Sequence, residues 1–368
     1  MPTKYVTSKT AQLQNASTGK KTVLIFGDEV KTSGSPEDGH IKAEFRGVTG
    51  LISEKQIGSK PALEIYFIDV GQGDSVFIVT PGRKKILIDG GVGRRALGFL
   101  AWKYRLGDSD TASVDIDLLV LSHADSDHIE GLIPIIQSPK INVRKVVHNG
   151  IATFKKDAYD TGLGKLSSDK TLLITRHDDV SDLDESSLDK RFSSWCEALK
   201  AEGTSCTAID SSMGTLDIGD PDISIEILGP RIDSYKGKPA LKWFKDVAHT
   251  INGHSVVLRL KYKNVSILLP GDINMDGADY LIEESNIKAK ADAHVFKAPH
   301  HGSHEYSLPF LEAIKPQISV ISSGDEPDHG HPRAIFIGAV GHVSRSSSPL
   351  VFSTEIAATF VEEKGKTQ

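Results

Sequence analysis

Cysteines and long apolar runs are both scarce in this sequence. Only Cys196 and Cys206 occur among 368 residues, which excludes a disulfide framework and a zinc-finger pattern, although one bridge between the two stays open. No stretch approaches the roughly 18 uninterrupted apolar residues of a membrane span, and Met1 to Tyr5 lead into no apolar segment. We therefore expect a protein of the reducing cytoplasm, with neither a membrane helix nor a signal peptide.

An excess of basic residues is also missing. The chain has 43 Lys and Arg residues against 49 Asp and Glu residues, which gives a formal net charge of −6. This balance argues against tight, non-specific nucleic-acid binding through overall charge, although a local basic rim is still allowed. The hydrophobic fraction of 39% is ordinary for a folded soluble protein, and the length suffices for one large domain or two.

One short stretch, residues 118–132, gathers the side chains that carry chemistry. An apolar run ends at Ser122, and the next six residues contain four side chains of metal-binding types: His123, Asp125, Asp127 and His128. A new apolar periodicity from Ile129 predicts a helix. At a strand end, side chains two residues apart point to the same side, while those entering the helix face a second point nearby. The stretch therefore predicts two adjacent metal ions, which lie about 3.5–4 Å apart in two-metal hydrolytic sites.

A capped helix is the simpler interpretation of the same stretch, with Asp125 or Ser126 as the N-cap. Capping accounts for one carboxylate. It does not account for two histidines and a second carboxylate, so we favour metal binding.

Later segments carry the same types of side chain. Asp272 follows an apolar strand predicted at residues 265–269, where a simple Gly-Asp turn is the alternative interpretation. His300 and His301 follow a strand predicted at residues 293–297. His331 lies in a later Gly-His-Pro segment, where a plain loop histidine is the alternative.

The 118–132 stretch resembles the metallo-β-lactamase superfamily, whose signature there is His-x-His-x-Asp-His, with Asp125 in place of the second histidine. With that replacement it resembles, more narrowly, the hydrolase domain of the ComEC-type DNA-uptake family. Further motifs of that family follow in the family's order, at residues 67–75, 87–91, 269–272, 297–303 and 330–332. Since that family's membrane helices are missing here, we expect a soluble relative of the channel proteins.

The resemblance implies the α/β metallo-β-lactamase fold, a four-layer αββα sandwich, over residues 61–368. A polar insertion around residues 153–220 interrupts it. This insertion carries an acidic cluster and a predicted helix at residues 189–201, and it forms either a solvated face or a lid.

The resemblance also implies a site for two divalent metal ions. Its implied ligands are His123, Asp125, Asp127, His128, Asp272, His301 and His254. Asp272 takes the bridging position, His301 is favoured over His300, and His249 is a weaker candidate than His254. Because Asp125 supplies a hard oxygen donor where imidazole is usual, Mn²⁺ suits the site at least as well as Zn²⁺.

Further roles follow from the same resemblance. The catalytic residues are Asp127, His300 and His331, with a histidine as general acid. The residues expected to support the metals or the substrate are Asp89, Asp74, Ser303 and Asn252. Asp89 is expected to hold the loop of the metal motif through hydrogen bonds. Arg94 and Arg95 are either phosphate contacts or surface charges.

The first 60 residues have a different character. Residues 1–20 are rich in Thr, Ser, Gln and Lys, and we expect a flexible tail there. Residues 21–60 show short alternating apolar runs with turn residues between them, which predict a small β-barrel. The Phe-Gly-Asp, Phe-Arg-Gly and Thr-Gly-Leu-Ile segments resemble bacterial SH3-like domains. A hairpin extension of the main domain is the alternative.

These observations predict a metal-dependent hydrolase, and specifically a phosphodiesterase or nuclease that acts on DNA through a metal-activated hydroxide. DNA is implied by the resemblance alone, because the fold hosts many hydrolyses. One alternative is a hydrolase of a small ester, lactone or nucleotide. The other is a regulatory module whose SH3-like segment recruits a protein partner and whose hydrolase site is weak.

Overall fold

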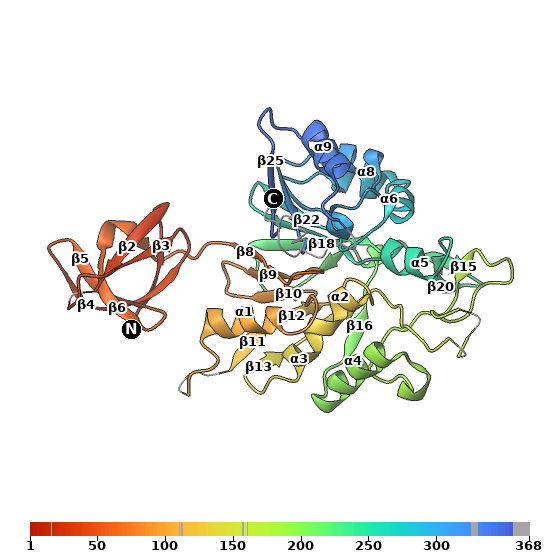
Figure 1. Cartoon of the computed structure of the whole chain (residues 1–368), viewed down its shortest axis with the longest axis horizontal. Helices are drawn as coiled ribbons and strands as arrows, with labels where there is room; N and C mark the ends of the chain where they lie inside the picture. Colours follow the sequence, from red (N-terminus) through yellow and green to blue (C-terminus); the bar gives the residue numbers. More distant parts are fainter. Residues whose placement is uncertain are drawn as a thin grey trace, which may run out of the picture. The chain divides into compact units, whose positions relative to one another are not determined.

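The chain divides into two compact units in the computed structural model (Figure 1). The first unit comprises residues 1–65, 78–85 and 219–222, and the second comprises the remainder. The structure describes residues 1–15, 17–109, 111, 113–156, 158–159, 161–324 and 330–355. Each unit is described by itself below.

Seven short strands build the first unit. They form one antiparallel sheet in the order β3-β2-β6-β5-β4-β1-β7. The strands are β1 (Thr3–Val6), β2 (Thr10–Gln14), β3 (Lys21–Ile25), β4 (Glu29–Glu37), β5 (His40–Phe45), β6 (Val48–Ser53) and β7 (Ile57–Gly58). Alternate side chains point inward and close a small core: Val6, Ala11, Leu13, Leu24, Val30, Ala43 and Ile52. The predicted small all-β domain is therefore confirmed, as an antiparallel half-barrel compatible with an SH3-like fold.

The prediction of a flexible tail at residues 1–20 is wrong, because these residues contribute two strands to the sheet. β1 and β2 lie within those residues, and Val6, Ala11 and Leu13 are at most 1% exposed. The polar composition is misleading because a strand with one solvated face needs apolar residues only at alternate positions.

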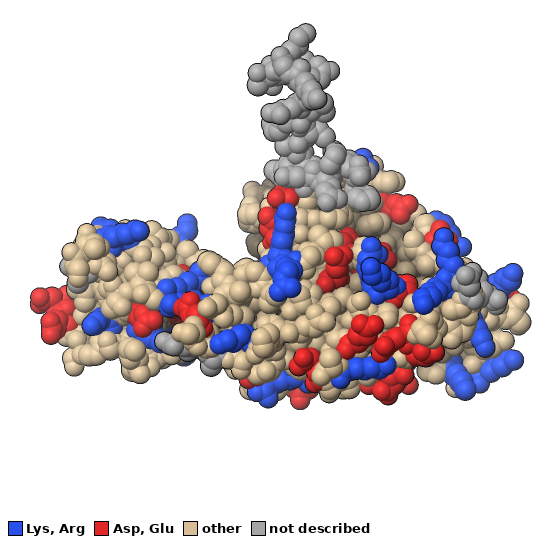
Figure 2. All heavy atoms as spheres, turned by 60° about the horizontal axis from the view of Figure 1, so that its bottom comes forward, with Lys and Arg blue, Asp and Glu red and all other residues tan. Residues whose placement is uncertain are grey.

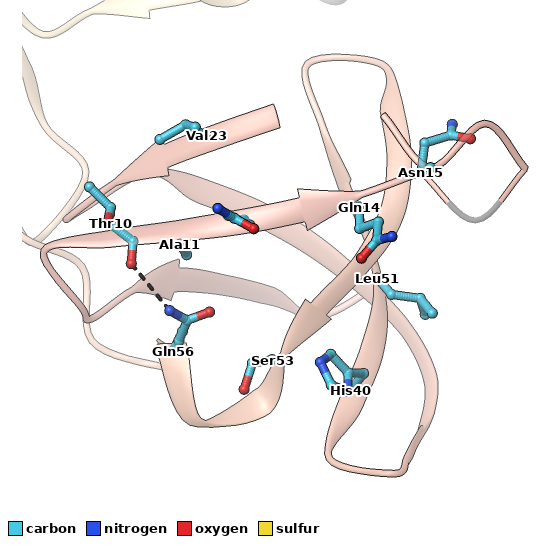
Figure 3. A pocket seen from close by; sticks show the side chains of 11 residues that line it. Thr10, Ala11, Gln14, Asn15, Val23, His40, Leu51, Ser53 and Gln56 are labelled. Atoms are coloured by element: carbon cyan, nitrogen blue, oxygen red, sulfur yellow. Dashed lines mark hydrogen bonds between the residues drawn. The ribbon is translucent and has the colours of Figure 1, made fainter. Parts of the chain in front are cut away.

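A cavity of about 750 Å³ opens on the outer face of this half-barrel (Figure 3). It lies where β2 and β6 diverge, since their only paired residues are Gln14 and Leu51. The Gln56 side-chain amide donates a hydrogen bond to the Thr10 carbonyl oxygen across the cavity, at 3.2 Å. The lining carries uncharged polar side chains together with Val23 and Leu51, and no acidic or basic residue except His40.

Two sheets lie at the centre of the remaining chain. The first has the order β16-β14-β12-β10-β9-β8 and the second the order β17-β18-β21-β22-β23-β24-β25. The first sheet contains β8 (Glu64–Phe67), β9 (Val76–Val79), β10 (Lys85–Ile88), β12 (Leu118–Val120), β14 (Val146–His148) and β16 (Cys206–Ala208). The second contains β17 (Thr215–Leu216), β18 (Ile223–Gly229), β21 (Val257–Tyr262), β22 (Val265–Leu269), β23 (Val295–Lys297), β24 (Ile318–Ile321) and β25 (Leu350–Ser353).

Helices cover the outer faces of both sheets, which gives the predicted four-layer αββα sandwich (Figure 1). On the first sheet lie α1 (Arg95–Tyr104), α2 (Ser126–Ile129), α3 (Ile133–Ile136) and α4 (Lys190–Ala201). On the second lie α6 (Met275–Ile282), α7 (Ser285–Lys290), α8 (Leu308–Ile314) and α9 (Ala334–Val343). The short α5 (Val247–Gly253) packs beside α6.

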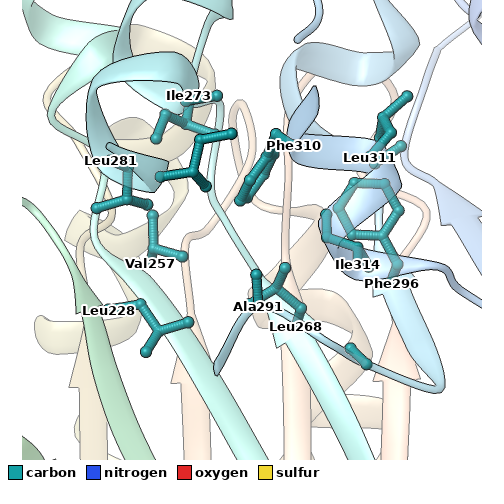
Figure 4. Packing of buried hydrophobic residues seen from close by; sticks show 14 of the residues in the cluster. Leu228, Val257, Leu268, Ile273, Leu281, Ala291, Phe296, Phe310, Leu311 and Ile314 are labelled. Carbon is teal, nitrogen blue, oxygen red and sulfur yellow. The ribbon is translucent and has the colours of Figure 1, made fainter. Parts of the chain in front are cut away.

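The second sheet and its helices share one core (Figure 4). Leu268 and Phe296 from the strands meet Leu281 of α6 and Phe310 of α8, and each is at most 2% exposed. This packing fixes the ends of β22 and β23, from which the candidate site residues project.

The polar region around residues 153–220 contains ordered elements. Its predicted helix corresponds to α4, which begins after Asp189. The Asp189 side chain accepts hydrogen bonds from two backbone N–H groups of the first turn.

Two small sheets complete the second unit. β15 (Leu172–Leu173) joins β20 (Lys238–Lys242) and β19 (Asp233–Tyr235), and β11 (Val114–Ile116) pairs with β13 (Ile141–Val143). Cys196 and Cys206 are buried free thiols. Among the described residues, no helix has both the length and the apolar character needed to cross a membrane.

Candidate metal centre

The metal motif begins at the carboxyl end of β12. Strands β10, β12 and β14 are parallel, so the residues that follow them meet at one edge of the sheet. Asp125 occupies the N-cap position of α2, with extended backbone angles (φ −69°, ψ 152°), yet its side chain accepts no capping hydrogen bond. Helix capping therefore does not explain this carboxylate.

Asp89, which follows β10, holds the motif in place. Its Oδ1 accepts a hydrogen bond from the Ser122 backbone N–H at 2.8 Å. Its Oδ2 accepts from the Ser122 hydroxyl at 2.6 Å and from His128 Nδ1 at 2.9 Å. These are the contacts expected of a residue that holds the metal-motif loop.

The Gly-Gln-Gly turn before Asp74 packs directly on the motif. Gly73 has φ 101°, and a Cβ atom there would lie 2.0 Å from the Asp127 carbonyl oxygen, so only glycine fits. Gln72 Nε2 donates a hydrogen bond to Asp127 Oδ2 at 3.4 Å. The turn therefore holds both the backbone and the side chain of Asp127 in place.

Asp272 approaches the motif from the opposite sheet, after β22 and a turn through Gly271 (φ 56°). Its Oδ2 lies 3.2 Å from His128 Nε2 and 2.9 Å from His301 Nε2. His301 Nε2 is also 3.2 Å from Asp127 Oδ2. Residues from the two halves of the fold thus converge on one buried point.

The three histidines of this cluster share one orientation. Nδ1–H of His128 donates to Asp89, and Nδ1–H of His301 donates to the Ser322 carbonyl oxygen at 3.0 Å. His123 Nδ1 lies 2.9 Å from the Ser122 hydroxyl, whose own proton is directed to Asp89, so the histidine is the donor there. Each ring therefore turns Nε2 away from these partners, and His128 and His301 direct it at Asp272, which is the orientation of metal-binding histidines.

These residues fit divalent cations. Four overlapping groups bring their ligand atoms within 4.8 Å of one another: His123/His128/Asp272, Asp127/His128/His301, Asp74/Asp272/His301 and Asp74/Asp89/His128. The Nε2 atoms of His128 and His301 are buried and have no hydrogen-bond partner within the described part of the chain. A cluster of imidazole and carboxylate donors with such orphaned atoms matches the ligand chemistry of Zn²⁺ and Mn²⁺.

The electrostatics of the cluster favour positive charge. Burial opposes protonation of His301, but Asp272 and Asp127 outweigh it and raise the pKa of His301 to about 10. His128 likewise has a raised pKa, since Asp272 and Asp89 overcome the effect of burial. Burial and the neighbouring His128 lower the pKa of His123 to about 3, so this ring is a neutral donor at physiological pH.

A polar pocket of about 360 Å³ opens onto the cluster. Its lining residues are Gln72, Val92, Asp125, Ser126, Asp127, Asn252, Asp272, His300, His301 and His331. His300 and His301 both have left-handed backbone angles (φ 47° and 54°). This double turn directs His301 into the cluster and leaves His300 in the pocket wall, where its ring lies 5.9 Å from that of His331.

Two predicted residues are not brought to the cluster. His254 Nε2 donates to the Lys242 carbonyl oxygen at 2.7 Å, and the ring packs 5.0 Å from that of Phe244. This placement does not support His254 as a metal ligand. The Ser303 hydroxyl accepts a hydrogen bond from the Glu305 N–H at 3.2 Å, within its own turn.

Two other candidates, Asp125 and Asn252, have intermediate positions, and His249 lies outside the cluster. The Asp125 side chain is 37% exposed, with Oδ2 3.7 Å from His123 Nε2. Asn252 lies in the pocket wall, and its Oδ1 is buried with no hydrogen-bond partner among the described residues. His249 pairs with Asp246 at 2.9 Å, away from the cluster.

Lys297 belongs to the site and was missed by sequence reasoning. It ends β23 with 2% exposure, and its ammonium contacts the carboxylate of Asp74 and, at 3.1 Å, Asp272 Oδ1. The available signal was a lysine at the end of an apolar strand, three residues before His300. Its partners lie far away in the chain, so the pairing required the folded structure.

Comparison with known proteins agrees with this geometry. Residues 68–325 match the family described as the metallo-beta-lactamase superfamily, and the chain belongs to that family. It is distantly homologous to ComE operon protein 3 of Bacillus subtilis (strain 168), with 25% identity over an alignment of 283 residues that covers 73% of this chain. The chain spans 29% of the length of that relative.

Solved structures show weaker likeness. A metallo-beta-lactamase HARLDQ motif mutant from Cronobacter sakazakii aligns at 14% identity and a TM-score of 0.33, covering 63% of this chain and 75% of that one. CmlA, a diiron beta-hydroxylase from Streptomyces venezuelae, aligns at 11% identity and a TM-score of 0.40, covering 80% and 53%.

Proposed function

We propose that this chain is a phosphodiesterase that depends on two divalent metal ions, Zn²⁺ or Mn²⁺, and that cleaves DNA. The observation that carries the proposal is the convergence of His128 Nε2 and His301 Nε2 on Asp272 Oδ2 beside a polar pocket, with Asp127 Oδ2 3.2 Å from His301 Nε2. In our assignment, Asp127, His128 and His301 would hold one ion, His123 and Asp125 would hold the other, and Asp272 would complete the site.

The ions supply charge neutralisation at the phosphate and lower the pKa of the attacking water. The chain's own residues position the metal ligands and supply the proton for the leaving group. Asp89, Ser122 and Ser322 fix the histidine rings, and the tight turn at Gly73 fixes Asp127. His300 and His331 stand in the pocket wall, where either ring can hold a proton for the departing oxygen.

Support for DNA comes from the resemblance to the ComEC-type family and from arginines around the pocket. The Arg95 guanidinium lies over Gly71, beside Gln72 of the pocket wall. The backbone N–H of Arg333 donates to the Gly302 carbonyl oxygen at 2.9 Å, two residues from His331. These exposed side chains supply local positive charge where the whole chain is acidic.

The face drawn in Figure 2 has no extended basic track on its described residues. On the face shown in Figure 2, basic and acidic side chains are interspersed. Specific recognition of a strand at the pocket therefore fits this surface better than non-specific binding to long duplex DNA.

The test is cleavage of end-labelled single-stranded DNA, duplex DNA, RNA and a chromogenic phosphodiester, each with Mn²⁺, Zn²⁺, Mg²⁺ or a chelator. Asp127→Ala should abolish metal-dependent cleavage. Asp115→Ala, which removes a half-exposed carboxylate paired with Arg144 at 2.7 Å, should leave it unchanged. No cleavage of any of these substrates, by protein that holds its metal ions, would contradict the proposal.

The pocket volume favours a second candidate, hydrolysis of a small ester, lactone or nucleotide, because about 360 Å³ suits a small molecule. Activity on such compounds combined with no DNA binding at low salt would select it. The cavity on the outer face of the half-barrel also supports recruitment of a protein partner by the first unit.

A further inference from the structure

Lys297 is a charged side chain in the interior of the second unit. It ends β23 and is 2% exposed. Its ammonium contacts the carboxylate of Asp74, the carbonyl oxygen of Gly271 at 3.0 Å and Asp272 Oδ1 at 3.1 Å. Burial of an ammonium is costly unless it is paired and hydrogen-bonded, and all three of these partners are oxygen atoms.

The two oxygens of Asp272 are used differently. Oδ1 accepts hydrogen bonds from Lys297 and from the His300 backbone N–H at 3.0 Å. Oδ2 faces His128 Nε2 and His301 Nε2. The carboxylate therefore cannot rotate without breaking the contacts on its lysine side, so Oδ2 is the oxygen presented to the histidines.

Asp74, Asp272 and His301 form one of the four groups with metal-ligand spacing. This group differs from the others because an ammonium already lies against two of its three members. The group Asp74/Asp89/His128 is likewise occupied, since His128 Nδ1 donates its proton to Asp89. Lys297 contacts one member of the group His123/His128/Asp272, namely Asp272 through Oδ1, and no member of the group Asp127/His128/His301.

We propose that Lys297 is a built-in cation that takes the place of a third metal ion between Asp74 and Asp272. The lysine thereby limits divalent ions to the remaining groups and positions Asp272 for them. This proposal rests on the proposed function in one respect, namely that the remaining groups hold divalent ions. Lys297 is a positioning residue, since it touches Asp272 and not the pocket.

Charge balance supports this assignment. Five carboxylates surround the centre, those of Asp74, Asp89, Asp125, Asp127 and Asp272. When all are ionised they carry five negative charges. Two divalent ions supply four positive charges, and the ammonium of Lys297 supplies the fifth, so the buried centre is neutral without a third ion.

Lys297→Met tests the proposal, because methionine keeps an unbranched chain and removes the charge. The readouts are the number of Co²⁺ ions that stay bound per chain after desalting and the visible absorption of the Co²⁺-loaded protein. A Lys297→Met/Asp74→Asn double variant also removes the carboxylate that loses its ammonium partner in the single variant. Lys200→Met is the matched control, since it removes a surface lysine that pairs with Glu185 at 2.6 Å.

We expect Lys297→Met to hold more Co²⁺ than the wild type, with a changed absorption spectrum, because the carboxylate of Asp74 and Asp272 Oδ1 become available to a cation. The double variant should return to the wild-type number of ions. Lys200→Met should match the wild type in both readouts.

Three results would overturn the inference. One is a folded Lys297→Met variant, checked by circular dichroism, that has the ion count and spectrum of the wild type. Another is a gain of Co²⁺ that persists in the double variant. The third is a Lys297→Met variant that loses Co²⁺ or fails to fold even when Co²⁺ is present, because the proposed role is to exclude a cation. If the wild type itself binds no Co²⁺, the proposed function fails instead.

Discussion

Individual residues of the motif could be predicted when their neighbours in the chain carry the information. His123, Asp127 and His128 lie within six residues, and the strand-to-helix turn brings them together locally. Lys297 could not be predicted, because its role depends on Asp74, which arrives from the other sheet. The direction of His254 depends on the Lys242 carbonyl oxygen, and no sequence pattern reports it.

Asp89 provides the residue-level prediction. Its carboxylate accepts three hydrogen bonds, two from Ser122 and one from His128 Nδ1. In Asp89→Asn, the amide group would present N–H to one of these donors, so the orientation of His128 would be lost. We expect about 10- to 100-fold weaker metal binding, measured by Mn²⁺ or Co²⁺ titration.

Asp292→Asn is the control, since this half-exposed carboxylate pairs with Arg345 at 2.7 Å, away from the centre. It should bind metal as the wild type does. An Asp89→Asn variant with unchanged affinity would show that the hydrogen bonds of Asp89 are not needed to orient the ligands.

At the scale of elements, the two sheets follow from apolar strands with turn residues between them, and the predicted helix at residues 189–201 corresponds to α4. β1 and β2 were missed because only alternate residues of these strands are apolar. His254 connects elements: it contacts β20 through Lys242, and its carbonyl oxygen accepts a hydrogen bond from Asn149, after β14.

This connection predicts a pH dependence of stability. Burial lowers the pKa of His254 to about 4, whereas its ordinary value is 6.5. The folded state therefore binds this proton less readily than the unfolded state. The stabilisation that the neutral, buried His254 ring provides is present above pH 6.5 and is lost as the pH falls towards 4. Between pH 7 and pH 5 this loss amounts to about 2 kcal/mol.

His254→Gln keeps a donor for the Lys242 carbonyl oxygen and cannot titrate. Its free energy of unfolding, from urea denaturation with a chelator present, should fall less between pH 7 and pH 5 than that of the wild type, by about 2 kcal/mol. His342→Gln, at an exposed position, is the control and should follow the wild type. Parallel pH profiles of wild type and His254→Gln would argue against a neutral buried His254.

On the scale of the whole molecule, the chain consists of a half-barrel unit and a metallo-β-lactamase unit. All residues of the proposed centre belong to the second unit. The fold of that unit could be predicted because several motifs occur in the family's order. The role of the first unit could not, since its cavity is lined by common polar side chains with no reactive group except His40.

Deletion of residues 1–60 should leave the rate of phosphodiester cleavage per metal-loaded chain unchanged, because the deleted residues supply no ligand. The measurement is initial rate against substrate concentration, for the truncated and the full chain at equal metal content. A large loss of activity in a truncated chain that is folded and metal-loaded would assign the first unit a part in substrate binding.

The central claim is that the His/Asp cluster binds divalent ions that hydrolysis requires. The most direct measurement is the metal content per chain of the wild type and of Asp272→Asn, together with phosphodiester cleavage before chelation, after chelation and after Mn²⁺ or Zn²⁺ is restored. We expect about two ions per wild-type chain, fewer in Asp272→Asn, and activity that disappears with the ions and returns with them. Cleavage that survives complete removal of the ions, or a wild-type chain that binds none, would contradict it.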